Sequence, residues 1–299
     1  MVSIPACVDA FRKICFVARM TDQNTLPHSG AVLGIDVGFS PTKRSSAACC
    51  LEWDTQQITW TIRRFRALPV EQEATIAAVA ADKLLEAAAR DGPMRAGFEV
   101  IGRYRTAERM LTGFPLASRI GKPGQSSAPV GKNLNAAANA CARVILRRCR
   151  LGAAKHAIRI DDMAVVEAFP SSFLGVMLND PAAVAARRRD RSDRFFEHLA
   201  MAETLQNLLG YLLPGRAIML PFNGVKNHDD RAALVCALTA LVVAAGDFVA
   251  VGDADGWIVL PPHCFVQGWA WADLEANARK ESRDCLHRSL SWQSDKTDS

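Results

Sequence analysis

The chain lacks several features that would assign it to a common class of proteins. Its nine cysteines are an odd number and include no C-x-x-C pair, so a zinc site built on cysteines is not expected. No apolar run is long enough to cross a membrane. The N-terminus lacks the ordered charge, apolar core and small-residue cleavage site of a signal peptide. We therefore expect a cytoplasmic protein with reduced, buried cysteines and no membrane partner.

The chain also lacks a large excess of charge of one sign. Its 36 basic and 31 acidic residues leave a net charge of +5, which by itself is no signature of nucleic-acid binding. Of its 299 residues 49% are hydrophobic, an ordinary globular composition, and no internal repeat or low-complexity linker interrupts them. We expect one domain over residues 31–265, with an N-terminal extension (1–30) before it and a C-terminal helix and polar tail (266–299) after it.

The stretch from residue 31 to 51, AVLGIDVGFSPTKRSSAACCL, carries the clearest functional signal. An apolar run typical of a buried strand is interrupted by one carboxylate, Asp36. An ionised carboxylate among apolar neighbours requires a cation or strong hydrogen-bond donors nearby. The chain then passes through a Gly/Pro loop that contains Lys43 before a second apolar run begins. This pattern predicts a site for a metal ion or a phosphate.

The order of the expected elements indicates an α/β fold. Three strands at 32–37, 47–53 and 58–66 are joined by short links, which favours an antiparallel meander. We expect a helix over 70–90, ended by Asp91-Gly92-Pro93, and a fourth strand over 94–101 that carries Glu99. The later elements are helices at 103–111, 133–150, 171–213 (in pieces) and 227–245, a strand at 163–169 that carries Glu167, and a hairpin over 248–260. Together they predict a mixed sheet, the meander plus parallel strands, with helices on both faces.

Four segments carry a resemblance to a known family: GIDVG at 34–38, VEAFP at 166–170, HDDRAALVCALTAL at 228–241 and GDADGWIVLPP at 252–262. In this order they resemble a domain-of-unknown-function family of predicted ribonuclease H-like nucleases, over about residues 32–262. The resemblance implies a ribonuclease H-like fold with one metal site, formed by Asp36, Glu99, Glu167 and the Asp229-Asp230 pair. Two positions depart from the family: many members read I-D-x-P-L where this chain has Phe98-Glu99-Val100-Ile101, and many carry an aspartate where it has Ala232.

Carboxylates are also the ligands that such chemistry needs. Hydrolysis of a phosphodiester requires a nucleophilic water, a stabilised leaving group and neutralised charge, which two divalent ions roughly 4 Å apart can supply. Mg²⁺ and Mn²⁺ prefer hard oxygen ligands. The expected catalytic residues are Asp36, Glu99, Glu167 and Asp230, with Asp229 as a further metal ligand. Basic stretches at 143–150 and 187–194 would bind a polyanionic substrate.

Each of these residues also has a purely structural explanation. Backbone N–H groups of a turn can satisfy a strand-end acid such as Asp36 or Glu167, and Glu99 can face solvent on an edge strand. Asn227 with Asp230 three residues later resembles a capping box, and acids in a first turn favour the helix dipole. The weaker candidates for substrate contact are Lys43, Arg103, Arg105 and His228, for which a solvated surface or a helix start is the simpler explanation.

The leading functional hypothesis is a nuclease or phosphodiesterase that acts on nucleic acid with Mg²⁺ or Mn²⁺. One alternative is an actin-like ATP-dependent phosphotransferase, since a D-x-G strand with a polar loop also holds ATP phosphates, although no convincing second copy of such a strand is found. Another alternative is a non-catalytic nucleic-acid-binding protein with a degenerate site. The sequence does not distinguish DNA from RNA and specifies no oligomeric state.

Overall fold

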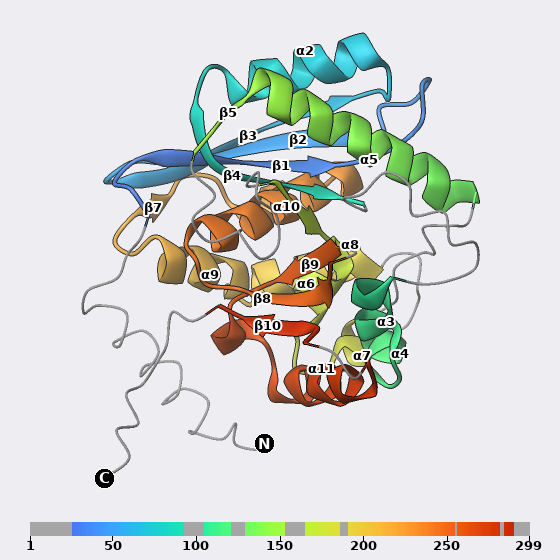
Figure 1. Cartoon of the computed structure of the whole chain (residues 1–299). Helices are drawn as coiled ribbons and strands as arrows, with labels where there is room; N and C mark the ends of the chain where they lie inside the picture. The colour runs from blue at the N-terminus through green and yellow to red at the C-terminus, as the bar shows by residue number, and fades with distance from the viewer. Residues whose placement is uncertain are drawn as a thin grey trace.

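One sheet of ten strands forms the centre of the protein (Figure 1). The computed structural model describes residues 26–92, 105–120, 129–152, 165–185, 191–254, 256–281 and 284–289. Nine of the strands follow the order β10-β8-β9-β6-β4-β1-β2-β3-β7, and β5 pairs with β4. Parallel and antiparallel pairs both occur and helices accompany them, so the expected α/β class with a mixed sheet is confirmed.

The N-terminal meander follows the sequence pattern. β1 (Gly30–Asp36), β2 (Ser46–Trp53) and β3 (Gln57–Phe65) are paired antiparallel in that order. Asp54 closes the link between β2 and β3, because its side chain accepts hydrogen bonds from the N–H groups of Gln56 and Gln57 at 2.7 and 2.9 Å. The expected meander is therefore confirmed, and it places Asp36 at the end of a buried strand.

The expected helix over 70–90 is wrong in its second half. α2 (Pro69–Ala80) ends where Ala81 and Asp82 adopt positive φ angles of 40° and 61°, and β4 (Leu84–Asp91) follows. β4 lies between β1 and β6 and is parallel to both. Its alanines have high helix propensity, but small apolar side chains also fit a strand that is buried on both faces. Pairing within the sheet overrides the local propensity here.

Most of the remaining expected pieces are observed with shifts at their ends, whereas a helix at 116–120 and short strands at 150–151 and 217–218 were not expected, and the expected strand over 94–101 lies outside the described residues. The helices are α3 (Thr106–Thr112), α4 (Leu116–Ile120), α5 (Pro129–Arg148), α6 (Pro170–Gly175), α7 (Pro181–Val184), α8 (Arg191–Met201), α9 (Thr204–Leu212), α10 (His228–Ala244) and α11 (Gly268–Glu281), with 3-10 turns η1 (Phe222–Gly224) and η2 (His263–Phe265). The strands are β5 (Arg150–Leu151), β6 (Val165–Ala168), β7 (Ala217–Ile218), β8 (Val249–Asp253), β9 (Gly256–Leu260) and β10 (Leu286–Arg288). Within the described ranges, no helix has both the length and the apolar character needed to cross a membrane.

Part of the expected C-terminal tail belongs to the sheet. β8 and β9 form the expected antiparallel hairpin, in which Gly252 and Gly256 have φ angles of 145° and 125°. β10 then pairs antiparallel with β8 on its outer side. The chain after α11 thus adds the strand at one edge of the sheet, while β7 forms the other edge beside β3.

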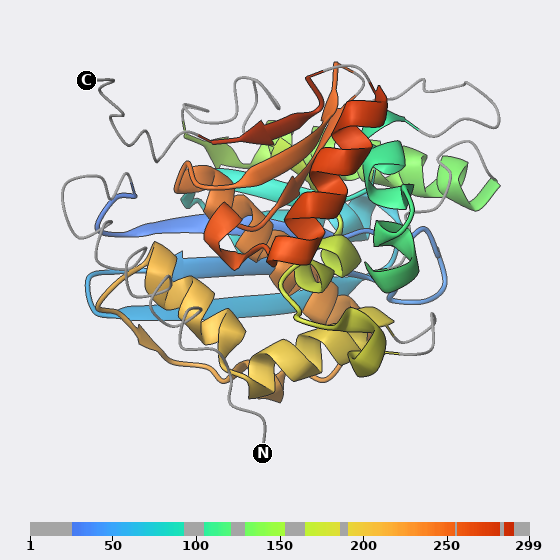
Figure 2. The same cartoon turned by 90° about the horizontal axis from the view of Figure 1, so that it is seen from below.

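Helices cover both faces of the central strands. α2 and α5 pack on one face, and α10 packs on the other, against β1, β2 and β4 (Figure 1). Seen from below, α11 (red) and α9 (gold) lie in front of the blue strands, so the α10 side carries a second layer of helices (Figure 2). Alternate side chains of β1 divide between the two cores: Leu33 and Ile35 face α2 and α5, whereas Val32 faces α10.

α10 and β1 approach each other very closely at Gly34. A Cβ atom built on Gly34 would lie 2.0 Å from the backbone nitrogen of Ala237 and 2.3 Å from the carbonyl oxygen of Ala233. Both are backbone atoms of a helix, which cannot move aside as the tip of a flexible side chain can. The absence of a side chain at Gly34 therefore fixes where the first turn of α10 lies relative to the end of β1.

Gly34→Val is expected to lower the free energy of unfolding by at least about 3 kcal/mol, because the added carbons overpack the contact with α10. Urea denaturation followed by far-UV circular dichroism measures the change. Gly210→Ala in α9 is the control, since nothing lies within 4 Å of a Cβ there, and it is expected to raise stability by about 0.5–1 kcal/mol. Equal stability of Gly34→Val and the wild type would contradict the close approach.

Candidate functional site

Asp36 and Asp91 end two neighbouring parallel strands. Ile35 of β1 is paired with Arg90 of β4, so the next residue on each strand is an aspartate at the same edge of the sheet. Neighbouring strands lie roughly 5 Å apart. On both strands, the alternation of side chains places the aspartate on the face that α10 covers. Two carboxylates therefore lie side by side under the start of α10.

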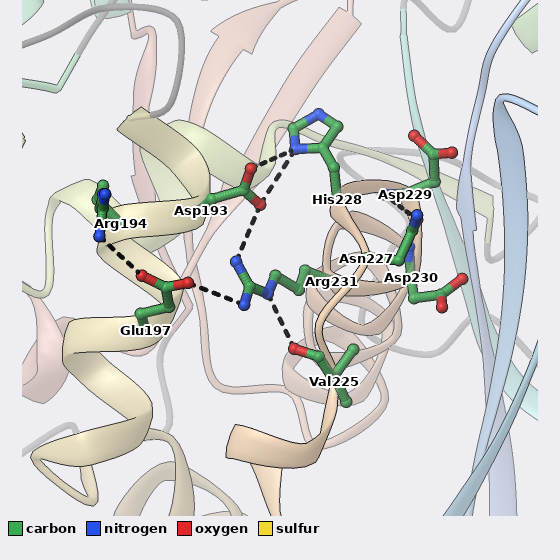
Figure 3. Close-up of polar contacts among 9 residues, drawn as sticks. All are labelled: Asp193, Arg194, Glu197, Val225, Asn227, His228, Asp229, Asp230 and Arg231. Atoms are coloured by element: carbon green, nitrogen blue, oxygen red, sulfur yellow. Dashed lines mark hydrogen bonds and ion pairs between the residues drawn. The ribbon is translucent and has the colours of Figure 1, made fainter.

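α10 brings two more acids to this place. The side-chain oxygen of Asn227 caps the helix by accepting hydrogen bonds from the N–H groups of Asp229 and Asp230, at 2.9 and 3.4 Å. The expected cap is therefore confirmed. The side chains of Asp229 and Asp230 point away from α8, toward the strands (Figure 3). Asp230 lies 3.5 Å from the guanidinium of Arg64 on β3, which is the cation that faces this acidic group from the sheet.

Asp36 is the buried centre of the four acids. It is 8% exposed, and burial raises its pKa well above the usual value. The charges of Asp91, Asp229 and Asp230 raise the pKa of Asp36 further. Burial is also the main reason why the pKa values of Asp229 and Asp230 are raised. Two segments distant in sequence, the end of β4 and the start of α10, thus place carboxylates within electrostatic reach of Asp36.

Asp91 has a raised pKa for two reasons. Burial comes first and the charge of Glu167 second, and together they raise the pKa of Asp91 to about 7. The N–H of Gly92 and the charges of Arg90 and His228 act in the opposite direction. A carboxyl that titrates near neutral pH in a group of acids is a common feature of functional sites.

Asp91 is also the member of the group that sequence reasoning missed. The sequence interpretation takes Asp91-Gly92-Pro93 as a helix stop and expects the fourth-strand acid at Glu99. Because β4 ends at Asp91, this residue occupies the position at the end of the fourth strand. Glu99 and Arg103 lie outside the described residues. The spacing of Asp91 and Pro93, which fits the D-x-P part of I-D-x-P-L, was the signal that could have identified it.

His228 and Arg231 occupy the other side of the first turn of α10 and face α8 (Figure 3). His228 Nδ1 lies 3.2 Å from both carboxylate oxygens of Asp193, and this contact raises the pKa of His228 and lowers that of Asp193. Arg231 lies 3.3 Å from Asp193 and 3.0 Å from Glu197, and its Nε donates to the carbonyl of Val225 at 2.9 Å. Ion pairs therefore fix the start of α10 from the α8 side.

Glu167 is not among the acids whose charges raise the pKa of Asp36, although its charge reaches Asp91. Along β6, Val166 and Ala168 face the α10 core, so alternation directs Glu167 to the other face. Arg105 donates two hydrogen bonds to the oxygens of Glu167, at 2.8 and 2.6 Å, and a third to Glu108 at 3.1 Å. Both oxygens of Glu167 are thereby engaged, which argues against its expected role as a metal ligand.

Two weaker candidates also receive a clear location. Arg105 is 2% exposed and belongs to this buried ion pair, so it is no surface contact for phosphate. Lys43 lies on the exposed loop between β1 and β2, where its N–H donates to Ser40 Oγ at 3.0 Å. Its side chain is open to solvent, which leaves the expected phosphate contact possible in geometric terms.

The protonation of Asp91 makes stability depend on pH. Because its pKa is higher in the folded than in the unfolded chain, the folded state binds more protons between about pH 4 and pH 7, and stability falls as pH rises through that window. Asp91→Asn has no titrating carboxyl at this position and therefore does not lose stability in this way as the pH rises. The variant is expected to be more stable than the wild type by roughly 1–2 kcal/mol at pH 8 and to lose this advantage at pH 4.

Urea denaturation at the two pH values measures the difference. Asp54→Asn is the control with the opposite sign, because hydrogen bonds from Gln56 and Gln57 lower the pKa of Asp54 and its ionised form is the favoured one. A stability gain for Asp91→Asn that is as large at pH 4 as at pH 8 would show that protonation is not its cause.

Arg105→Ala is expected to lower the free energy of unfolding by about 3–5 kcal/mol, because it leaves the buried carboxylates of Glu167 and Glu108 without a partner. Arg109→Ala is the matched control on the same helix, since its pair with Glu281 is partly exposed and is worth about 1 kcal/mol or less. Thermal and urea unfolding compare the two variants. Similar losses in both would refute the difference in burial.

Comparisons of this chain with protein-family models, with curated proteins and with solved structures found no match.

Proposed function

We propose that the protein is a metal-dependent phosphodiesterase that cleaves nucleic acid, with Asp36, Asp91, Asp229 and Asp230 as its metal-binding acids. The observation that carries the proposal is the position of a buried Asp36 at the end of β1, with Asp91 at the end of the neighbouring strand and Asp229 and Asp230 at the start of the helix that covers both. Mutual repulsion of this kind costs stability, and proteins retain it where a cation or a reaction uses it. A divalent cation would relieve the repulsion.

The donor set fits Mg²⁺ or Mn²⁺, which both prefer carboxylate oxygens. Within the described residues, however, no three His, Cys, Asp or Glu side chains stand at the spacing of a ready-made metal site. The fit therefore rests on the type of ligand, the burial and the uncompensated negative charge. The divalent ion would supply a water of lowered pKa and neutralise charge on the phosphate.

The chain's own residues divide the remaining tasks. Asp36 lies at the end of β1, and the carboxylate of Asp91 beside it accepts a hydrogen bond from the N–H of Gly92, which orients this second carboxylate before a ligand arrives. Arg64 lies next to Asp230 and can contact a phosphate oxygen from the β3 side. Asp193 raises the pKa of His228, and the charge of His228 lowers the pKa of Asp91, so this histidine would offset part of the negative charge of the site.

The strand order supports the ribonuclease H-like part of the proposal. The antiparallel meander β3-β2-β1 continues into the parallel strands β4 and β6, and helices lie on both faces. Asp91 ends the fourth strand, and the sequence continues as D-x-P, which is closer to the family pattern than Glu99 is. The other departure, Ala232, remains, and the acids of the first turn of α10 would replace the aspartate that many members of the family carry at that position. We also propose a reducing compartment such as the cytoplasm, because none of the seven cysteines in the described ranges forms a disulfide.

A non-catalytic nucleic-acid-binding protein is the second candidate. The observation in its favour is that the described acids are not gathered at metal-ligand spacing. In that case the acids would contribute to repulsion without chemistry, and metal would change neither stability nor substrate. The following experiment separates the two candidates.

Purified protein with Mn²⁺ or Mg²⁺ is expected to cleave labelled DNA, RNA or DNA–RNA hybrids, as measured on denaturing gels. Asp36→Asn and Asp91→Asn are each expected to lower the rate at least about 100-fold, because each removes a ligand charge from the cation. Mn²⁺ is also expected to raise the melting temperature of the wild type but not of Asp36→Asn.

Asp284→Asn, an exposed acid just before β10 at the far edge of the sheet, is the matched control and is expected to behave as the wild type. Absence of cleavage on all three substrates, together with a melting temperature that does not respond to Mn²⁺, would reject the proposal in favour of the non-catalytic candidate.

A further inference from the structure

A basic hollow lies on the surface beside the acidic site. It has a volume of about 700 Å³ and forms where the end of β3 meets the start of α2. The residues that line it are Arg44, Arg63, Arg64, Arg66, Leu68, Val70, Glu71, Ala74 and Thr75. Four guanidiniums thus share this hollow with one carboxylate. Sequence reasoning expected the polyanion contacts elsewhere, at 143–150 and 187–194.

The positive charge of the hollow is only partly compensated. Arg66 donates to Glu71 at 2.6 Å, and Arg44 lies 3.6 Å from the same carboxylate. One carboxylate therefore serves two arginines whose side chains are 44% and 68% exposed. Arg63 is also exposed. By contrast, Arg147 and Arg148 of the expected basic stretch both bind Glu73 on α2.

The start of α2 adds to the attraction for anions. Leu68 and Val70 flank Pro69, the first residue of this twelve-residue helix, and both line the hollow. The positive end of the helix dipole therefore lies at the same surface as the arginines. Two independent features favour the binding of phosphate here.

Arg64 joins the hollow to the acidic site. Its side chain lines the hollow, and its Nε lies 3.5 Å from Asp230 Oδ1. Side chains at positions 63 and 64 of β3 point to opposite faces of the sheet. Arg63 therefore lies on the face that α2 covers, and Arg64 lies on the face that α10 covers. Positions 63 to 66 extend over roughly 10 Å, which exceeds the size of one phosphate group.

We propose that this hollow binds the sugar-phosphate backbone of a single nucleic-acid strand and leads it past Arg64 to the acids at the end of β1. The inference rests on the proposed function, since it names the path of that substrate. None of the lining residues is aromatic, so the hollow offers no aromatic platform for a base, and we expect binding to depend on phosphate rather than on sequence. A chain of phosphates fits this row of charges better than a single anion does.

The test measures binding without cleavage. A fluorescein-labelled 20-nucleotide single strand is titrated with protein in EDTA, and anisotropy is recorded at several salt concentrations. The double variant Arg63→Ala/Arg66→Ala is expected to raise Kd at least about tenfold and to lower the slope of log K against log salt by about 1.4, that is, about 0.7 for each lost phosphate contact. Strands of unrelated sequence are expected to bind alike.

The control variant Arg279→Ala/Arg288→Ala removes the same charge from exposed positions on α11 and β10, at the opposite end of the sheet, and is expected to bind as the wild type. Urea denaturation shows that each variant is folded. Equal loss of binding in both double variants would assign the effect to net charge and would overturn the proposal, as would unchanged binding by Arg63→Ala/Arg66→Ala.

Failure of this inference differs from failure of the proposed function. Cleavage that depends on Asp36, together with normal binding by Arg63→Ala/Arg66→Ala, would reject the hollow as the binding site and support the proposed phosphodiesterase activity. Weaker binding by this variant without any metal-dependent cleavage would support the hollow as the binding site and reject the proposed phosphodiesterase activity. Tight binding of the wild type to phosphatidylserine vesicles, lost in Arg63→Ala/Arg66→Ala, with no binding to the oligonucleotide, would assign the hollow to a membrane surface and overturn the proposal.

Discussion

The close contact between α10 and β1 at Gly34 is the constraint on which the arrangement of the site depends. A helix that rests on a strand with no side chain between them has its position fixed by backbone atoms. Two residues further along β1 is Asp36, and about one turn before the contact, α10 presents Asp229 and Asp230. Packing that serves the core thereby places three acids near one another, and β4 adds Asp91 from the neighbouring strand.

Such a group of acids is unfavourable for folding by itself. Burial and repulsion both raise the pKa values of its members, so their ionised forms cost stability near neutral pH. Two features of the structure reduce this cost: the N-terminal end of α10 favours negative charge in its first turn, and Arg64 lies beside Asp230. The remaining imbalance is what distinguishes the group from an ordinary surface cluster and what makes it a candidate site.

Glu167 and Asp36 show how similar sequence patterns can have different structural outcomes. Both are single acids near the end of an apolar strand. Glu167 is satisfied by a bidentate pair with Arg105, and the buried network continues to Glu108. The partner of a buried carboxylate therefore decides whether it stabilises the fold or stays available, and that partner comes from a helix 62 residues away in the chain.

The sequence by itself determined the elements with strong local signals. Alternation, short links and turn residues predict the meander, the hairpin at 248–260, the capped start of α10 and the position of Asp36 at the end of a buried strand, because each depends on neighbours close in the chain. It misassigned 84–91 as helix, since alanine favours a helix locally whereas the pairing with β1 and β6 is a long-range interaction. Only the tertiary structure decided that Asp91 stands beside Asp36, that Glu167 belongs to Arg105, and that the arginines of β3 gather with α2. These outcomes depend on strand register and on contacts between distant segments, which no local pattern encodes.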